Sequence, residues 1–179
     1  MAERGVGGVV SGTLICYMKP GPMEPPRAFE DFAVGQRFRS ARARAVGAAE
    51  IKAFAAEFDP QPFHLDEEAA RRTPFGGLVA SGWHTAALGM RLIVDSDLGL
   101  GGQGAGVAVE NMRWRRPVRA GDALRVEGTV IEARASRSRP ASGIVKFQTR
   151  LLNQRDEVVL EASHVVLVSR RSVPSGGAR

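Results

Sequence analysis

One acid–imidazole pair stands out among the residues that could carry chemistry. Asp59 and His64 lie five residues apart in the run Asp59-Pro60-Gln61-Pro62-Phe63-His64. Each proline fixes its own φ angle and restricts the residue before it, so this run should be stiff. A carboxylate and an imidazole held together can bind and polarise one water molecule, which is what general acid–base catalysis requires. The alternative is a structural turn in which Asp59 caps a nearby backbone amide.

A second candidate is the glycine-rich run Phe75-Gly76-Gly77-Leu78-Val79-Ala80-Ser81-Gly82, which leads into a long apolar stretch. If that stretch is a helix, its first backbone N–H groups have no partners within the helix and can stabilise a developing negative charge on oxygen. Gly82 would then let a ligand approach closely, although glycine at this position can equally serve helix packing. An acid–imidazole pair beside an amide-lined helix terminus suits enolate chemistry next to a thioester carbonyl.

The other histidines and the single cysteine have simpler explanations. His84 falls one turn into the predicted helix, where we expect a partly buried, hydrogen-bonded side chain, and His164 falls in a strand-like run. Cys16 is the only cysteine, which excludes an intrachain disulfide and a cysteine-based zinc finger. We therefore predict no metal site, and we expect a reducing, cytoplasmic compartment.

The helices that flank Asp59 and His64 are predicted from apolar periodicity. Over 48–58, apolar residues recur at i, i+3, i+4 and i+7 and define the face expected to be buried: Ile51, Phe54, Ala55 and Phe58. Asp66 can cap a short helix that ends before Thr73-Pro74. The stretch 78–94 is apolar on every side, which predicts a buried helix of about 14 residues, too short to cross a membrane.

Strands are predicted on both sides of these helices. One strand runs through 38–46, and four longer strands follow the buried helix: 107–114, 123–133, 144–152 and 158–168. The glycine-rich segment 99–106 connects the helix to them. The pattern is an α+β fold, because the sheet must supply the surface that buries the helix.

The domain organisation is predicted from composition. The Pro/Gly-rich segments 1–28 and 172–179 are predicted to be disordered tails around a single domain, 29–171. Translation could begin at Met1, Met18 or Met23.

The strongly basic charge balance allows two interpretations. The formal net charge is +6, and all but three of the 25 basic residues are arginines. A basic chain suggests a nucleic-acid partner, but the arginines are scattered, and one tyrosine and two tryptophans are too few for a base-stacking platform. We therefore expect neither a nucleic-acid nor a membrane partner. The arginines form either a solvated surface or a site for a phosphate-bearing ligand such as coenzyme A.

The sequence resembles the MaoC-like dehydratases, which include the (R)-specific enoyl-CoA hydratases and adopt the hot-dog fold. The resemblance covers roughly residues 29–170 and rests on five motifs in the family's order. These motifs are 29–36 (FEDFAVGQ), 47–55 (GAAEIKAFA), 59–66 (DPQPFHLD), 80–82 (ASG) and 116–122 (RPVRAGD). The family signature D-x-N-P-x-H keeps its spacing here, with Gln61 in place of the usual asparagine.

The resemblance implies a long buried helix wrapped by a curved antiparallel β-sheet, in a chain that pairs as a homodimer or a larger homo-oligomer. It implies that Asp59 and His64 hold the water that adds to, or leaves from, the β-carbon of an acyl thioester, and that Gly82 donates a backbone N–H to the thioester oxygen. No bound cofactor is implied, since coenzyme A or an acyl-carrier arm belongs to the substrate. The expected activity is hydration of 2-enoyl thioesters or dehydration of 3-hydroxyacyl thioesters.

Four more residues are predicted to bind substrate: Ser81, Trp83, Met90 and Arg116. Met90 lies about two helical turns after Trp83, so the two side chains either line the acyl pocket or pack in the core. Two other functions stay open: a thioesterase on the same fold, and a non-catalytic subunit that binds acyl thioesters. The presence of both Asp59 and His64 favours the hydratase.

Overall fold

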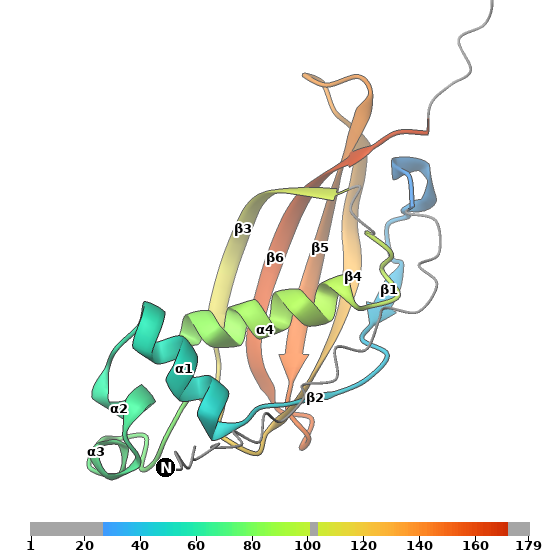
Figure 1. The fold of residues 1–179 in the computed structure, drawn as a ribbon. Helices are drawn as coiled ribbons and strands as arrows, with labels where there is room; N and C mark the ends of the chain where they lie inside the picture. The colour runs from blue at the N-terminus through green and yellow to red at the C-terminus, as the bar shows by residue number, and fades with distance from the viewer. Residues whose placement is uncertain (1–26, 101–103, 172–179) are drawn as a thin grey trace, which may run out of the picture.

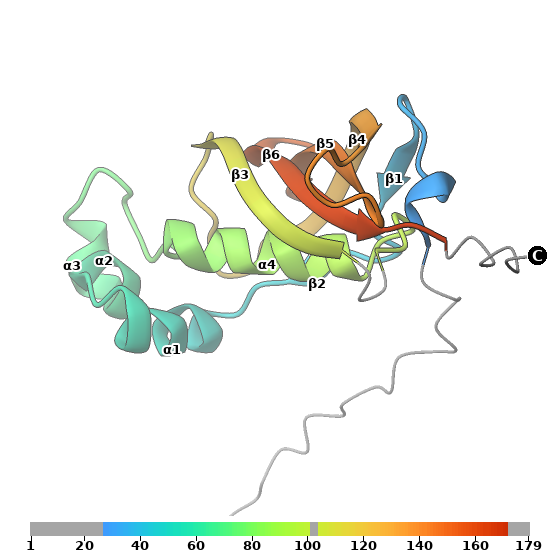
Figure 2. The same ribbon diagram turned by 90° about the horizontal axis from the view of Figure 1, so that it is seen from above.

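The structure is a computed structural model that describes residues 27–100 and 104–171. Most of the two predicted tails and part of the glycine-rich connector therefore lie outside the described residues. Helix α4 (Gly82–Val94) lies across one face of an antiparallel sheet that curves around it (Figures 1 and 2). This arrangement confirms the predicted α+β, hot-dog architecture.

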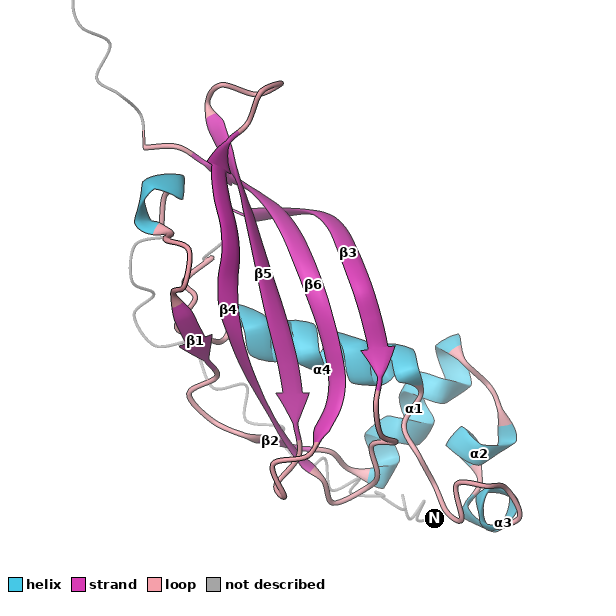
Figure 3. Cartoon of the chain, turned by 180° about the vertical axis from the view of Figure 1, so that it is seen from behind, coloured by secondary structure: helices cyan, strands magenta, loops and turns pink. Residues whose placement is uncertain are grey.

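The sheet has six strands, and β4, β5 and β6 form its centre (Figure 3). The order is β1-β4-β5-β6-β3, with the short β2 paired separately to β4, and every pairing is antiparallel. The strand bounds are β1 (Arg37–Arg39), β2 (Arg44–Ala45), β3 (Gly104–Trp114), β4 (Ala123–Ala135), β5 (Ser142–Leu152) and β6 (Val158–Ser169). The four long strands are thus confirmed, whereas the strand predicted at 38–46 is broken into β1 and β2.

The core lies between α4 and the sheet and follows from the alternation of side chains along the strands. In β5, Val145, Phe147 and Leu151 are buried on the helix side. Phe147 meets Phe38 of β1 edge to face, with the ring centroids 5.5 Å apart. A Cβ on Gly128 of β4 would lie 2.2 Å from the Phe38 ring, so glycine is needed at this position.

Helix α4 buries only one of its faces in the single chain. Leu88, Leu92 and Ile93 are buried against the sheet. Trp83 and Met90 lie on the other side of the helix and are 62% and 44% exposed. The prediction that this helix is buried on all sides is therefore wrong for one chain, and an apolar face is left uncovered.

Three short helices cluster at the N-terminal end of α4 (Figure 2). They are α1 (Ala48–Phe58), α2 (Pro62–Leu65) and α3 (Glu67–Arg71), and a 3-10 turn η1 (Phe29–Asp31) begins the described chain. Helix α1 buries Ile51 and Ala55 as predicted, but Phe58 is 63% exposed, which corrects its place in the buried face. The Asp66 side chain accepts the Ala69 N–H at 2.7 Å, which confirms the predicted cap of α3. None of the helices in the described ranges is long and apolar enough to span a membrane.

Candidate active site

Asp59 and His64 come together because the chain turns sharply between α1 and α2. Asp59 is the C-terminal cap of α1, and Pro62 occupies the first turn of α2, where its missing N–H is not needed. His64 lies on the short helix α2 within this run, and it is buried. Its Nε2 is 3.4 Å from Asp59 Oδ2. The structure thus places the predicted acid–imidazole pair in one site.

The His64 ring is oriented by a backbone carbonyl. Its Nδ1 lies 2.8 Å from the Val79 carbonyl oxygen, which can only accept a hydrogen bond, so Nδ1 carries the proton. In the neutral imidazole, Nε2 is then an acceptor that faces another acceptor, Asp59 Oδ2. The two atoms cannot bond to each other in that state, but both can accept hydrogen bonds from one water molecule.

Ser81 ties the second candidate segment to this pair. Its side chain is fully buried, and its Oγ donates to Asp59 Oδ2 at 2.6 Å while accepting the Trp83 N–H at 3.2 Å. Ser81 is thus both the cap of α4 and a direct partner of the carboxylate. We predicted a substrate-binding side chain at this position, and the structure shows that the hydroxyl is engaged with Asp59.

The carboxylate of Asp59 has a donor on each oxygen. Gln61 Nε2 donates to Oδ1 at 2.7 Å, opposite the Ser81 bond to Oδ2. The hydrogen bonds from Ser81 and Gln61, together with the nearby His64, lower the pKa of Asp59, whereas burial acts to raise it. Asp59 is therefore ionised at neutral pH. Among the described residues, its carboxylate accepts from these two side chains and from no backbone amide, in contrast to the alternative interpretation of this segment.

Gly82 begins α4 next to the pair, so its N–H has no acceptor within the helix. Trp114, at the end of β3, covers this position. Its Nε1 donates to the Gly82 carbonyl at 2.8 Å, and a Cβ on Gly82 would lie 3.0 Å from the indole ring. Trp114 also meets Trp83 edge to face at 5.7 Å. Trp114 was not predicted as a site residue, because its proximity to Gly82 depends on a contact across 32 residues.

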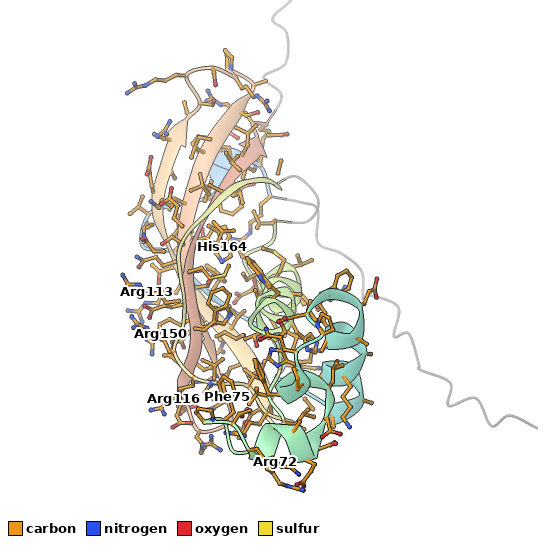
Figure 4. The ribbon with its side chains drawn as sticks, turned by 90° about the vertical axis from the view of Figure 1, so that its left-hand side faces the viewer. Arg72, Phe75, Arg113, Arg116, Arg150 and His164 are labelled. Atoms are coloured by element: carbon orange, nitrogen blue, oxygen red, sulfur yellow. The ribbon has the colours of Figure 1, made fainter. Side chains whose placement is uncertain are left out.

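The remaining candidates do not contact Asp59 or His64. Trp83 and Met90 lie on the exposed face of α4, which excludes core packing as their role in the single chain. The Arg116 guanidinium lies 3.6 Å from Glu157 and is more than half exposed. Arg113, Arg116 and Arg150 extend from the side of the sheet that faces away from the helices (Figure 4).

The two other histidines are not part of this site. His164 lies on β6 as predicted, is buried, and places Nε2 3.1 Å from the Thr149 hydroxyl. His84 is buried and stacks on Phe54 at 4.8 Å, but its Nδ1 has no hydrogen-bond partner among the described residues, contrary to the expected hydrogen bond.

A curved antiparallel sheet around one long helix is the hot-dog fold, and Asp59 and His64 lie close to the N-terminus of that helix. The sequence profile described as "MaoC like domain" matches residues 30–149, and the chain belongs to this family.

Individual relatives carry names of the same kind. The crystal structure of a MaoC-like dehydratase from Rhodospirillum rubrum is 56% identical, has a TM-score of 0.77, and the alignment covers 82% of this chain and 99% of that chain. A 3-hydroxybutyryl-CoA dehydratase from Methylorubrum extorquens is 34% identical over 149 residues, which are 80% of this chain and 85% of the relative. An (R)-hydratase from A. caviae involved in PHA biosynthesis is 28% identical, with a TM-score of 0.63, and the match covers 76% of this chain and 97% of that chain.

Proposed function

We propose that the protein is a hydratase/dehydratase that adds water to, or removes it from, the 2,3-bond of an acyl thioester. The observation that carries the proposal is the 3.4 Å separation of Asp59 Oδ2 and His64 Nε2, next to the first amide of α4. The names of the relatives, a 3-hydroxybutyryl-CoA dehydratase and an (R)-hydratase, support the same reaction class.

The catalytic step follows from the tautomer of His64. A water that donates one hydrogen bond to Asp59 and one to His64 has its lone pairs directed away from both, toward the substrate. As its oxygen bonds to the β-carbon, one proton passes to the Asp59–His64 pair, and the electrons of the double bond move to the thioester oxygen. The pair then returns that proton to the α-carbon, so that the net change is addition of H and OH.

The negative charge that develops on the thioester oxygen needs a donor. The Gly82 N–H supplies it in this proposal, since Ser81 already occupies the next amide, that of Trp83. Glycine at this position leaves room for the indole ring of Trp114, which a Cβ would meet at 3.0 Å.

The substrate residues beyond the reacting atoms are also part of the proposal. The acyl chain would run from Gly82 along the exposed side of α4, past Trp83 and Met90. Arg116, whose partner Glu157 leaves it more than half exposed, would face the phosphates of coenzyme A. Coenzyme A or a carrier arm would thus enter as part of the substrate, with no separate cofactor.

The test is a panel of 2-enoyl-CoA esters of increasing length, followed by loss of the absorbance of the conjugated thioester. We expect hydration without release of free thiol. Release of free thiol would instead show the thioesterase. Binding of the esters without turnover would show a non-catalytic subunit, and either result would contradict the proposal.

A further inference from the structure

Gln61 differs from the other partners of Asp59 because it belongs to the same turn of the chain. Its backbone N–H donates to the Asp59 carbonyl at 2.7 Å, which closes a three-residue turn around Pro60. Its side chain folds back over this turn, and Nε2 donates to Asp59 Oδ1 at 2.7 Å. One residue therefore holds both the backbone and the carboxylate of Asp59.

The bond to Oδ1 decides which way the carboxylate faces. Oδ2 is the oxygen that carries the Ser81 bond and lies 3.4 Å from His64 Nε2. The terminal torsion of an aspartate has a broad, roughly two-fold profile, so a carboxylate held at one oxygen alone can rotate. A donor on each oxygen removes this freedom.

We propose that Gln61 is a positioning residue, which fixes the Asp59 carboxylate so that Oδ2 faces His64 and the attacking water. The proposal rests on the proposed hydratase function for its kinetic consequence, but the contact between Gln61 and Asp59 can be tested without any substrate. The Gln61 side chain is exposed, so its loss should have little effect on the fold.

A charge effect accompanies the geometric one. Ser81 and Gln61 both donate to the ionised carboxylate and lower the pKa of Asp59, and His64 is the titratable group that acts on it from α2. Removal of the Gln61 donor should raise the pKa of Asp59. The pH below which the enzyme loses activity should rise with it, because the ionised carboxylate accepts the proton of water.

The experiment compares Gln61→Met, which keeps the length but removes the donor, with Gln61→Asn and Gln61→Glu. Gln154→Met is the matched control: Gln154 Nε2 donates to Asp122 Oδ1 at 3.0 Å, a carboxylate bond of the same type that contacts neither Asp59 nor His64. Two readouts are used: the NMR titration of the Asp59 carboxyl, and the pH profile of kcat/KM for an enoyl-CoA.

We expect Gln61→Met to raise two midpoints by about 0.5–1 pH unit: that of the Asp59 titration, and that of the loss of kcat/KM at acidic pH. We also expect it to lower kcat about 10-fold or more, with KM nearly unchanged. Gln61→Glu should raise both midpoints further because of like-charge repulsion, Gln61→Asn should restore part of the loss, and Gln154→Met should change neither midpoint. An unchanged Asp59 titration in Gln61→Met, or a shifted titration with wild-type kcat, overturns the proposal. If the wild type hydrates no enoyl thioester, the proposed function fails, and the titration alone decides whether Gln61 holds the carboxylate.

Discussion

At the scale of single residues, the Val79 carbonyl determines what His64 can do. Because its oxygen accepts the hydrogen bond from Nδ1, Nε2 is the ring nitrogen that faces Asp59 Oδ2, 3.4 Å away. In the proposed mechanism Asp59 and His64 act on one water, so the loss of either should abolish the same step. This shared role makes a quantitative prediction possible.

Asp59→Ala and His64→Ala should each lower kcat by at least ~10²-fold, the usual size of a general acid–base contribution. The double variant should lose little more than either single variant, because the same water is lost only once. Steady-state kinetics on the best enoyl-CoA substrate provide the measurement, and circular dichroism provides the control for folding. Additive losses in the double variant would show that the two side chains act on different steps.

The sequence predicted this pair but not its surroundings. Five-residue spacing and two prolines were enough to place Asp59 near His64, because the contact is local. Trp114 was missed, and Ser81 was expected to contact substrate rather than Asp59. Both contacts join segments more than 20 residues apart. Their geometry is set by how the end of α1 and the end of β3 each lie against the start of α4, rather than by a local pattern.

At the scale of elements, α4 shows why an apolar composition does not by itself predict which helix faces are buried. Its apolar residues occupy both faces, and only the face toward the sheet is buried in one chain. A sequence pattern indicates that an apolar face is covered, but it does not indicate whether the cover is this chain, a second copy or a ligand. These possibilities place different groups against the exposed side chains of Trp83 and Met90, so substitutions at these two residues can distinguish them.

If Trp83 and Met90 line the acyl path, Trp83→Ala and Met90→Ala should shift the preference toward longer enoyl thioesters. Each additional methylene that is accommodated is worth up to ~1 kcal/mol in kcat/KM. The chain-length profile of kcat/KM is the measurement, with Leu88→Ala as the control from the buried face of the same helix. That control should lose about 2–5 kcal/mol of stability and keep the parent profile. Unchanged profiles in both pocket variants would rule out the proposed acyl path.

The centre of the sheet contains a titratable group that couples folding to pH. Burial lowers the pKa of His164 to about 4 from an ordinary value of 6.5. The unfolded chain therefore binds a proton on His164 at a higher pH than the folded chain does. Stability should fall as the pH drops from 6.5 toward 4, and this contribution should then level off.

The substitution His164→Met, which replaces the imidazole with an apolar side chain that cannot titrate, isolates this effect. Between pH 7 and pH 4.5, wild type should lose about 2 kcal/mol more unfolding free energy than the variant does. Urea unfolding at the two pH values measures the difference, and the acid sensitivity of the carboxylates cancels between the proteins. Equal losses of unfolding free energy in the two proteins would mean that folding does not lower the pKa of His164.

At the scale of the whole molecule, one edge of the sheet has no further strand paired to it among the described residues. Strand β3 is 11 residues long, lies at the end of the strand order, and has exposed residues along most of its length. Its Val107 and Val109 are 60% and 49% exposed, and the exposed face of α4 is also apolar. A long apolar edge strand is prone to pair with another chain. We propose that the homodimer implied by the family resemblance forms along this edge, with a second copy beside β3.

The proposed homodimer makes a prediction about charge at this edge. Val109→Lys places a charge on β3, which disfavours edge-to-edge pairing, and it should reduce the mass in solution from about twice the 19.2 kDa chain to the single chain. Val34→Lys is the matched control, because Val34 is 65% exposed but lies outside β3 and α4, and this variant should remain dimeric. Light scattering during size-exclusion chromatography measures both masses. A monomeric wild type, or a Val109→Lys variant that stays dimeric, would show that β3 is not the contact.

Trp114 ends this same strand and covers Gly82. If the dimer stabilises the site, a monomeric Val109→Lys variant should therefore also have a lower kcat, and circular dichroism would confirm that the monomer is folded.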